Sequence, residues 1–221
     1  EVWIRTFQDR LYLAEQLKQV SRIYLSENTY VLDTKQRSVY FSEKFVLCMY
    51  SQLQMNIPSE YILILEDDIA FTESAKASVL EKIDMGYPCL WFSVPEQRCL
   101  DMATPQKDGV FKLLNPKVYY YSGAVLIKKQ LLKEFVTEFL FSQSELEYKN
   151  FDTTLSRFLI RRYGFIDILP SYFGTRPHTE SSINFENRDT SRLEVNISEL
   201  DPKFNPKEIV PELKEYIKEH K

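Results

Sequence analysis

One stretch constrains the fold more than any other. In Tyr61-Ile-Leu-Ile-Leu-Glu-Asp-Asp-Ile-Ala-Phe71, five apolar residues lead directly into three carboxylates. A short unbroken apolar run is typical of a fully buried central strand in an α/β sheet. Open α/β sheets bind ligands beyond the carboxyl ends of their strands, so Glu66, Asp67 and Asp68 lie where a ligand is expected. Because buried carboxylates need a positive partner, the alternatives are a divalent metal ion among them or an acidic turn that faces water.

The composition is that of a globular domain with a substantial core. Of 221 residues, 44% are hydrophobic and 27% charged, and the net charge is −4. This balance argues against nucleic acid or an anionic membrane as a partner, and no apolar run is long enough to span a membrane. The chain has only five glycines, which excludes a Gly-rich phosphate loop. Any phosphate must therefore be held by a metal ion, by cationic side chains or by a helix N-terminus.

The number of cysteines indicates in which cellular compartment the protein works. Cys48, Cys89 and Cys99 are an odd number without metal-ligand spacing, which favours a reducing environment. We therefore expect the cytoplasm, or the host cytoplasm if the protein is viral, rather than the Golgi lumen. The sequence shows no signal peptide and no initiator Met, so we expect that it is excised from a longer chain with further domains.

The order of predicted elements is that of an α/β domain. Residues 2–7 are predicted as a strand, 8–20 as a helix and 22–25 as a second strand, and this βαβ opening favours a parallel sheet. We expect a central, mostly parallel sheet of about six strands flanked by helices. The later strands are predicted at 61–65, 89–94, 110–114, 118–127 and 165–169, and the later helices at 38–53, 72–84, 128–141 and 151–163.

The connections carry further expectations. Thr72 is the expected N-cap of the helix over 72–84. Residues 95–109 are expected to form a loop, and residues 171–187 an irregular segment of the kind that carries function.

Three pieces of the sequence are predicted to converge at the carboxyl edge of the sheet. Glu66 and Asp68, two residues apart, are expected on the same side of the chain, where hard oxygen ligands suit Mg²⁺ or Mn²⁺ and a leaving diphosphate. Beyond the last strand, His178 could complete a metal shell and Arg176 could contact a diphosphate, or both could be solvated loop residues. Asp152, at a helix start, is either an N-cap or a general base for an acceptor hydroxyl.

Several of these motifs resemble the N-acetylglucosaminyltransferase IV family, whose members are GT-A-fold glycosyltransferases. The similarity covers roughly residues 30–71 and 165–183, and a viral or bacterial relative acting in the cytosol would explain the missing targeting signal. The matching motifs are Thr34-Lys-Gln, Met49-Tyr-Ser-Gln52, Leu65-Glu-Asp-Asp-Ile69 and Pro170-Ser-Tyr-Phe173 with Ser181-Ser182.

The resemblance implies an enzyme of protein glycosylation that moves a glucose- or N-acetylglucosamine-like sugar from a UDP-sugar to a hydroxyl of a glycan or glycoprotein. It implies Mn²⁺ or Mg²⁺ bound by Asp68 of a DXD-like motif, with Glu66 or Asp67 near the ribose or the metal. With Asp152 as the base, the transfer would invert the anomeric carbon. The implied donor-side residues are Thr6, Asp9 and Arg10 near uracil and ribose, Lys35 and Arg37 near the diphosphate, and Ser122 and Gly123 under the sugar.

The resemblance also divides the chain. A GT-A-like catalytic domain is expected over residues 1–187, with a nucleotide-binding half over about 1–94 and an acceptor half over about 95–187. Residues 188–221 are expected to form a tail with a charged helix near 211–219.

Two other functions stay open on the sequence alone. A sugar-phosphate nucleotidyltransferase also places acidic residues on an α/β sheet, but it normally has a Gly-rich N-terminal loop, and residues 1–12 contain no Gly. A non-catalytic carbohydrate-binding or scaffold module would suit the 14 Tyr and 15 Phe. Manganese-dependent binding of UDP would separate the transferase from such a module, and activity with a nucleoside triphosphate and a sugar phosphate would identify the nucleotidyltransferase.

Overall fold

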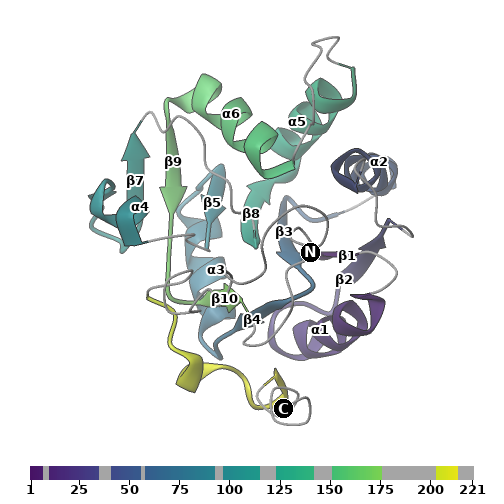
Figure 1. Cartoon of the computed structure of the whole chain (residues 1–221), viewed down its shortest axis with the longest axis horizontal. Helices are drawn as coiled ribbons and strands as arrows, with labels where there is room; N and C mark the ends of the chain where they lie inside the picture. Colours follow the sequence, from purple (N-terminus) through teal and green to yellow (C-terminus); the bar gives the residue numbers. More distant parts are fainter. Residues whose placement is uncertain are drawn as a thin grey trace, which may run out of the picture.

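The computed structural model describes eight stretches of the chain: residues 1–6, 10–34, 41–55, 58–92, 97–114, 123–141, 151–175 and 203–213. The strands of its large sheet are β1 (Val2–Thr6), β2 (Thr29–Asp33), β3 (Tyr61–Glu66), β5 (Cys89–Trp91), β6 (Thr104–Pro105), β7 (Phe111–Leu114), β8 (Ala124–Lys128) and β9 (Phe165–Ile168). Their order across the sheet is β2-β1-β3-β8-β5-β9-β7-β6 (Figure 1). Two further strands, β4 (Ile69–Phe71) and β10 (Phe173–Thr175), form a separate antiparallel pair.

The sheet is mixed, although most of its strands run in one direction. β1 is parallel to both β2 and β3, and β5 is parallel to β9. β8 lies between β3 and β5 and is antiparallel to both, and the β6–β7 hairpin extends the edge beyond β9. The predicted α/β class is therefore confirmed. The sheet has eight strands rather than about six, and the short strand β6, in a segment expected to be a loop, is one that was not predicted.

The period-two alternation of the strands gives the sheet two apolar faces. Trp3 and Ile64 belong to one core cluster, whereas Ile4 and Leu65 belong to the other. The first face is covered by α2, α5 and α6, and the second by α1, α3 and part of the C-terminal segment (Figure 1). The helices are α1 (Leu11–Tyr24), α2 (Phe41–Gln54), α3 (Ala75–Asp84), α4 (Gln97–Asp101), α5 (Lys129–Phe141) and α6 (Phe151–Tyr163).

Two early predictions were wrong. The strand expected over residues 22–25 is the last turn of α1, where the amide of Leu25 donates to the carbonyl of Ser21 at 2.8 Å. The second strand is β2 instead, because a short apolar run does not distinguish the end of an amphipathic helix from a strand. Thr72 is not the N-cap of α3; that position is Ser74, whose hydroxyl lies 3.0 Å from the hydroxyl of Thr72.

Three other boundaries also differ from expectation. The loop expected over 95–109 contains α4 and β6. The strand expected over 118–127 begins at Ala124, and residues 115–122 lie outside the described part of the chain. The segment expected to be irregular from residue 171 includes β10, which pairs with β4 about one hundred residues earlier.

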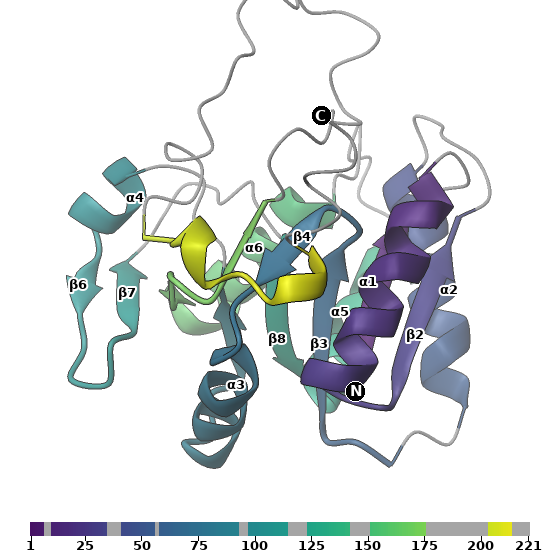
Figure 2. The ribbon, with the colours of Figure 1, turned by 90° about the horizontal axis from the view of Figure 1, so that it is seen from below.

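The C-terminal segment over residues 203–213 packs on the β4–β10 pair, and Figure 2 shows it beside β4. The amide of Val210 donates to the carbonyl of Phe71 at 3.1 Å, and Thr72 and Ile209 form an isolated bridge. A Cβ on Gly174 would lie 2.3 Å from the ring of Phe204, so the glycine permits this close approach. Residues 211–213 are helical, which agrees with the start of the predicted helix, whose remainder lies outside the described residues.

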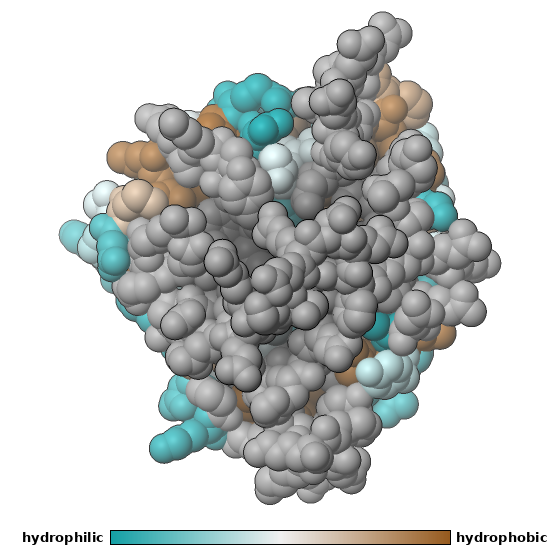
Figure 3. All heavy atoms as spheres, in the orientation of Figure 1, coloured by the Kyte–Doolittle hydropathy of each residue, from teal (hydrophilic) through white to brown (hydrophobic). Residues whose placement is uncertain are grey.

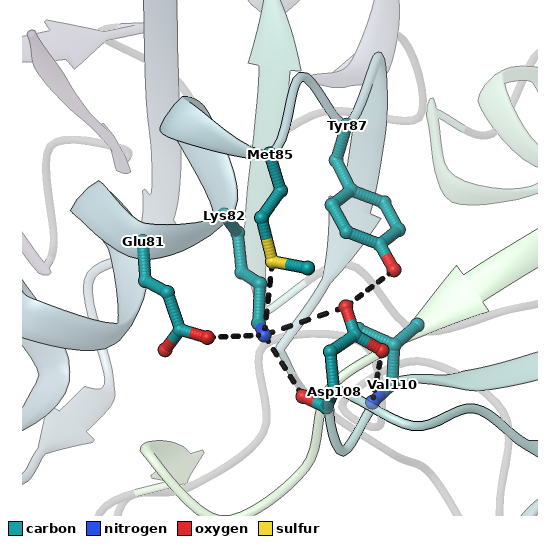
Figure 4. A network of polar contacts seen from close by, with 6 residues as sticks. All are labelled: Glu81, Lys82, Met85, Tyr87, Asp108 and Val110. Carbon is teal, nitrogen blue, oxygen red and sulfur yellow. Dashed lines mark hydrogen bonds and ion pairs between the residues drawn. The ribbon is translucent and has the colours of Figure 1, made fainter.

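A buried lysine holds the β6–β7 hairpin against α3 (Figure 4). Lys82 is 2% exposed, and its Nζ donates to the carbonyl oxygen of Asp108 at 2.8 Å and to Glu81 Oε1 at 3.0 Å. The Asp108 carboxylate also accepts from Tyr87 at 2.6 Å and lies 3.4 Å from Lys82 Nζ. Burial raises the pKa of Asp108, but the Tyr87 hydrogen bond and Lys82 outweigh this and lower it. The cluster is saturated with partners, so we interpret it as structural.

We expect Lys82→Met to lower the free energy of unfolding by about 2–4 kcal/mol, because it leaves the Asp108 carboxylate half-buried beside an apolar group. Chemical denaturation would measure the change. Lys76→Met, at an exposed position of the same helix, is the matched control and should change stability by less than about 0.5 kcal/mol. Equal effects of the two substitutions would contradict the structural role of Lys82.

The exposed apolar side chains of the described residues are scattered. In Figure 3 the brown areas, which mark hydrophobic residues, lie at separate places toward the edge of the view. The exposed apolar side chains include Ile23, Met102 and Phe141, which come from different elements. None of the helices in the described ranges is long and apolar enough to cross a lipid bilayer.

Candidate active site

Two parallel strands bring the candidate residues to one edge of the sheet. In the β1–β3 register Arg5 lies opposite Glu66, so both strands end together. The acidic turn of Asp67 and Asp68 follows β3 directly, and Arg10 is the N-cap residue of α1, a few residues after β1. The same edge therefore collects charged residues from β1, β3 and the start of α1.

The first charge cluster is built on Arg5. Its guanidinium forms an ion pair with Glu66, and its Nη1 lies 3.2 Å from Asp152 Oδ1 in the first turn of α6. The guanidinium carbon lies 5.6 Å from the ring centroid of Phe45 and 5.1 Å from that of Phe151. Arg5 is 6% exposed, so this is a buried cation held by two carboxylates and two aromatic rings.

The second charge cluster is built on Arg10. Its Nη2 lies 2.8 Å from Asp67 Oδ1 and 2.9 Å from Asp68 Oδ2. The hydroxyl of Thr6, at the end of β1, donates to Asp67 Oδ2 at 2.6 Å. Burial lowers the pKa of Arg10, but the Asp68 and Asp67 carboxylates outweigh burial and raise it. Arg10 therefore stays charged and partly neutralises the acidic turn.

The three carboxylates of the motif are shared between two arginines. Glu66 is the last residue of β3 and lies on the face that carries Arg5, whereas the chain turns at Asp67 and Asp68 toward Arg10. The expected alternation that would place Glu66 and Asp68 together requires the strand to continue through residue 68, and it does not. These two residues contact different cations.

The described carboxylates meet some, but not all, of the requirements of a site for a divalent cation. Among the described residues, the four carboxylates of the two clusters face two guanidinium groups, and the formal charges of these six groups sum to −2. Asp68 Oδ1 is buried and has no hydrogen-bond partner among these residues, although a buried carboxylate oxygen normally has one. Within the described ranges no group of three or more His, Cys, Asp or Glu side chains could hold a metal by itself. A cation there would need further ligands from elsewhere.

The other predicted site residues divide into two groups. Gly123 is buried directly before β8, and its carbonyl accepts the amide of Glu66 at 2.8 Å, which ties it to the end of β3. It precedes the strand rather than lying inside it. The remaining predicted residues lie outside the described part of the chain: Asp9, Lys35, Arg37, Ser122, Arg176 and His178.

Sequence reasoning missed Arg5. It is the only charged residue in the buried strand β1, Val2-Trp-Ile-Arg-Thr6. An unpaired charge in a buried strand is costly, so a lone arginine there indicates a buried anionic partner. The sequence therefore contained evidence for an anionic partner of Arg5, but it could not identify Glu66 or Asp152 as that partner.

A further buried carboxylate lies away from this edge. Asp167 in β9 is 6% exposed, and its Oδ1 has no hydrogen-bond partner within the described residues. It lines a small pocket with Cys89, Trp91 and Phe165. Burial raises the pKa of Asp167 to about 6; Lys112 opposes this rise and Asp108 adds to it.

Asp167→Asn is expected to stabilise the protein above neutral pH. The folded-state pKa of about 6 exceeds the usual 3.8, so the carboxyl contributes stability below pH 3.8 that is lost as the pH rises through 6. At pH 8 the amide should raise the free energy of unfolding by about 1–2 kcal/mol, after allowance for solvent screening. Thermal unfolding at pH 8 and pH 4 would measure this. A gain that is the same at both pH values, or also seen for exposed Asp84→Asn, would contradict it.

No protein-family model matches the chain, and no curated protein matches it. Among solved structures, it is similar to a glycosyltransferase involved in glycosylation of the major capsid of PBCV-1, with 14% identity, 73% of each chain covered and a TM-score of 0.46. It is also similar to A197 from STIV, with 16% identity over 60% of this chain and 66% of that one and a TM-score of 0.39.

A third similar structure is 4-diphosphocytidyl-2C-methyl-D-erythritol synthase from Anaerococcus prevotii. The identity is 14%, with 76% of this chain and 68% of that chain covered and a TM-score of 0.42. At these identities and TM-scores none of the three likenesses carries functional information. The α/β architecture itself follows from the strand order and pairing of the chain.

Proposed function

We propose that the chain is a metal-dependent glycosyltransferase of the GT-A type that transfers a sugar from a UDP-sugar to a hydroxyl of a glycan or glycoprotein. The observation that carries this proposal is the group of carboxylates that the described residues place at the carboxyl edge of the sheet, where Asp67, Asp68 and Asp152 are buried and Glu66 is half-buried. Two arginines face four carboxylates, and the buried Asp68 Oδ1 has no hydrogen-bond partner among the described residues. An edge of this charge and position suits a divalent cation and the diphosphate that it bridges.

The donor side is formed by the end of β3 and the start of α1. Asp68, together with His178, would hold Mn²⁺ or Mg²⁺, which supplies Lewis-acid stabilisation of a leaving diphosphate when it is bound. Glu66 was also expected as a metal ligand, but it pairs with Arg5 on the other side of the turn, so we place it near the ribose. Thr6 holds Asp67 and thereby fixes the acidic turn. Arg10, which contacts Asp68 at 2.9 Å, lies close enough to the turn to meet an incoming phosphate.

The remaining donor contacts follow the resemblance to the N-acetylglucosaminyltransferase IV family. Gly123 lies beside Glu66, where it would approach the donor sugar. The other proposed donor contacts are Asp9, Lys35, Arg37, Ser122 and Arg176.

The acceptor side is formed by Asp152. Its carboxylate would take the proton of the acceptor hydroxyl while that oxygen forms a bond to the anomeric carbon and the bond to UDP breaks. Attack opposite the leaving group inverts the anomeric centre. Support comes from the position of Asp152, which is buried and linked through Arg5 to Glu66 on the donor side.

The proposed division of the chain follows from the same resemblance. The nucleotide-binding half would span about residues 1–94 and the acceptor half about 95–187, followed by the C-terminal segment. The odd number of cysteines favours a reducing environment, so the enzyme would act in the cytoplasm, or in the host cytoplasm if it is viral.

The test of the proposal is a binding panel of UDP, GDP, CMP and their sugars with and without MnCl₂. We expect UDP and UDP-sugars to raise the Tm only when Mn²⁺ is present, because the cation links the acidic turn to the diphosphate. Calorimetry of UDP with Mn²⁺ and with EDTA would confirm the linkage. Failure of every nucleotide to bind would overturn the proposal, whereas turnover of a nucleoside triphosphate with a sugar phosphate would identify a nucleotidyltransferase.

A further inference from the structure

We propose that Arg5 is a positioning residue that holds the donor-side carboxylate Glu66 and the acceptor-side carboxylate Asp152 in one fixed arrangement. This inference rests on the proposed function and adds a residue that the sequence motifs did not indicate. Arg5 contacts no reacting atom in this scheme. It acts through Glu66, on the donor side of the transferred sugar, and through Asp152, on the acceptor side.

The placement of Arg5 follows from the sheet. Arg5 and Glu66 lie opposite each other on neighbouring parallel strands, so their side chains leave the sheet on the same face. α6 covers that face, and its first turn brings Asp152 Oδ1 to 3.2 Å from Arg5 Nη1, while Nη2 pairs with Glu66. One guanidinium therefore joins β1, β3 and α6.

The arrangement is rigid for two reasons. The planar guanidinium presents its donors in a fixed fork, so the two carboxylates that it binds have a defined separation. The rings of Phe45 and Phe151, at 5.6 and 5.1 Å from the guanidinium carbon, confine it further. Phe151 precedes Asp152 in the same helical turn, so the ring that packs on Arg5 and the carboxylate that pairs with it move together.

A lysine could not replace this function. Its ammonium is a compact point charge, whereas Arg5 uses different nitrogens for Glu66 and Asp152. Arg5→Lys keeps the positive charge that pairs with Glu66 and the buried Asp152 but gives up the fork. The substitution therefore separates positioning from neutralisation, which Arg5→Met would remove together.

The test is a pair of double-mutant cycles. For the acceptor side, kcat for UDP release from UDP-glucose or UDP-N-acetylglucosamine is measured with a methyl glycoside acceptor in wild type, Arg5→Lys, Asp152→Asn and the double variant. Arg5→Lys should lower kcat about 10–100-fold, as expected for a displaced reacting group. At saturating UDP-sugar, where weaker donor binding through Glu66 does not enter kcat, Arg5→Lys should change kcat by less than about threefold in the Asp152→Asn background, because a base that is absent cannot be misplaced.

The donor side gives a readout that needs no acceptor. The Kd of UDP in the presence of Mn²⁺ is measured in wild type, Arg5→Lys, Glu66→Gln and their combination. Introduced alone, Arg5→Lys should weaken the affinity for UDP. Introduced together with Glu66→Gln, it should weaken that affinity little further. Arg162→Lys is the matched control, since Arg162 lies in the same helix as Asp152 and pairs with Glu134 at 2.6 Å at the surface.

The outcomes separate the two hypotheses. A wild-type protein that neither binds UDP with Mn²⁺ nor releases it from a UDP-sugar would overturn the proposed function and, with it, the role of Arg5. An active wild type in which Arg5→Lys is silent, or in which its effects simply add to those of Asp152→Asn and Glu66→Gln, would overturn the role of Arg5 alone. Folding of each variant is verified by its thermal unfolding, with kinetics measured well below its own Tm.

Discussion

Asp152→Asn is expected to lower sugar transfer by about 10²–10⁴-fold, the usual contribution of a general base. The reason is chemical, since an amide cannot take the proton of the attacking hydroxyl. The fold should survive, because the amide oxygen of Asn can still accept from Arg5 Nη1, which lies 3.2 Å from Asp152 Oδ1 in the native protein. Binding of UDP with Mn²⁺ should stay within about threefold of wild type, because the substitution leaves the donor contacts in place.

The measurement is UDP release in the presence of the methyl glycoside that the wild type uses best, combined with calorimetry of UDP. Asp84→Asn, an exposed carboxylate at the end of α3, is the control and should leave both readouts unchanged. Near-normal turnover by Asp152→Asn would remove the base role and, with it, the argument for inversion. A loss of UDP binding equal to the loss of turnover would instead show that Asp152 belongs to the donor site.

Asp68→Ala should weaken Mn²⁺-dependent binding of UDP by at least about 100-fold, because the carboxylate provides the proposed direct metal ligand. The buried Oδ1, which has no hydrogen-bond partner within the described ranges, is the atom that we expect to meet the cation. Removal of Asp68 leaves Arg10 with Asp67, which lies 2.8 Å from its Nη2, so the fold should remain intact. Any binding of UDP that persists in EDTA should be unaffected or improved, since Arg10 then faces one carboxylate fewer.

Calorimetry of UDP with Mn²⁺ and with EDTA would measure both effects. Glu73→Ala, an exposed carboxylate five residues along the chain, is the matched control. Unchanged affinity of Asp68→Ala in the presence of Mn²⁺ would overturn the metal assignment. Loss of binding in both conditions would show that Asp68 orders the turn rather than binds the metal.

Much of the scaffold around this site could be predicted from local patterns. The apolar spacing of residues 151–163 predicted a helix, and α6 runs from Phe151 to Tyr163. The apolar run from Tyr61 predicted a buried strand with carboxylates at its end, and β3 ends at Glu66. These predictions succeeded because helical and strand periodicities are local consequences of which face is buried.

The arrangement inside the site could not be predicted in the same way. Arg5 meets Asp152 across 147 positions of the chain, and Thr6 meets Asp67 across 61. The β4–β10 pair and the contact of Phe204 with Gly174 likewise join distant segments. A short apolar run can belong to a strand or to a helix end, and for this reason the end of α1 was wrongly predicted to be a strand.

By itself the sequence determined that an α/β sheet forms around a buried strand and that carboxylates stand at the end of that strand. Both follow from the order of apolar and polar residues along a few turns or strands. Only the tertiary structure decided that Glu66 pairs with Arg5 whereas Asp67 and Asp68 share Arg10. The reason is that strand register and helix packing select the ion partners, and both depend on contacts between residues far apart in the chain.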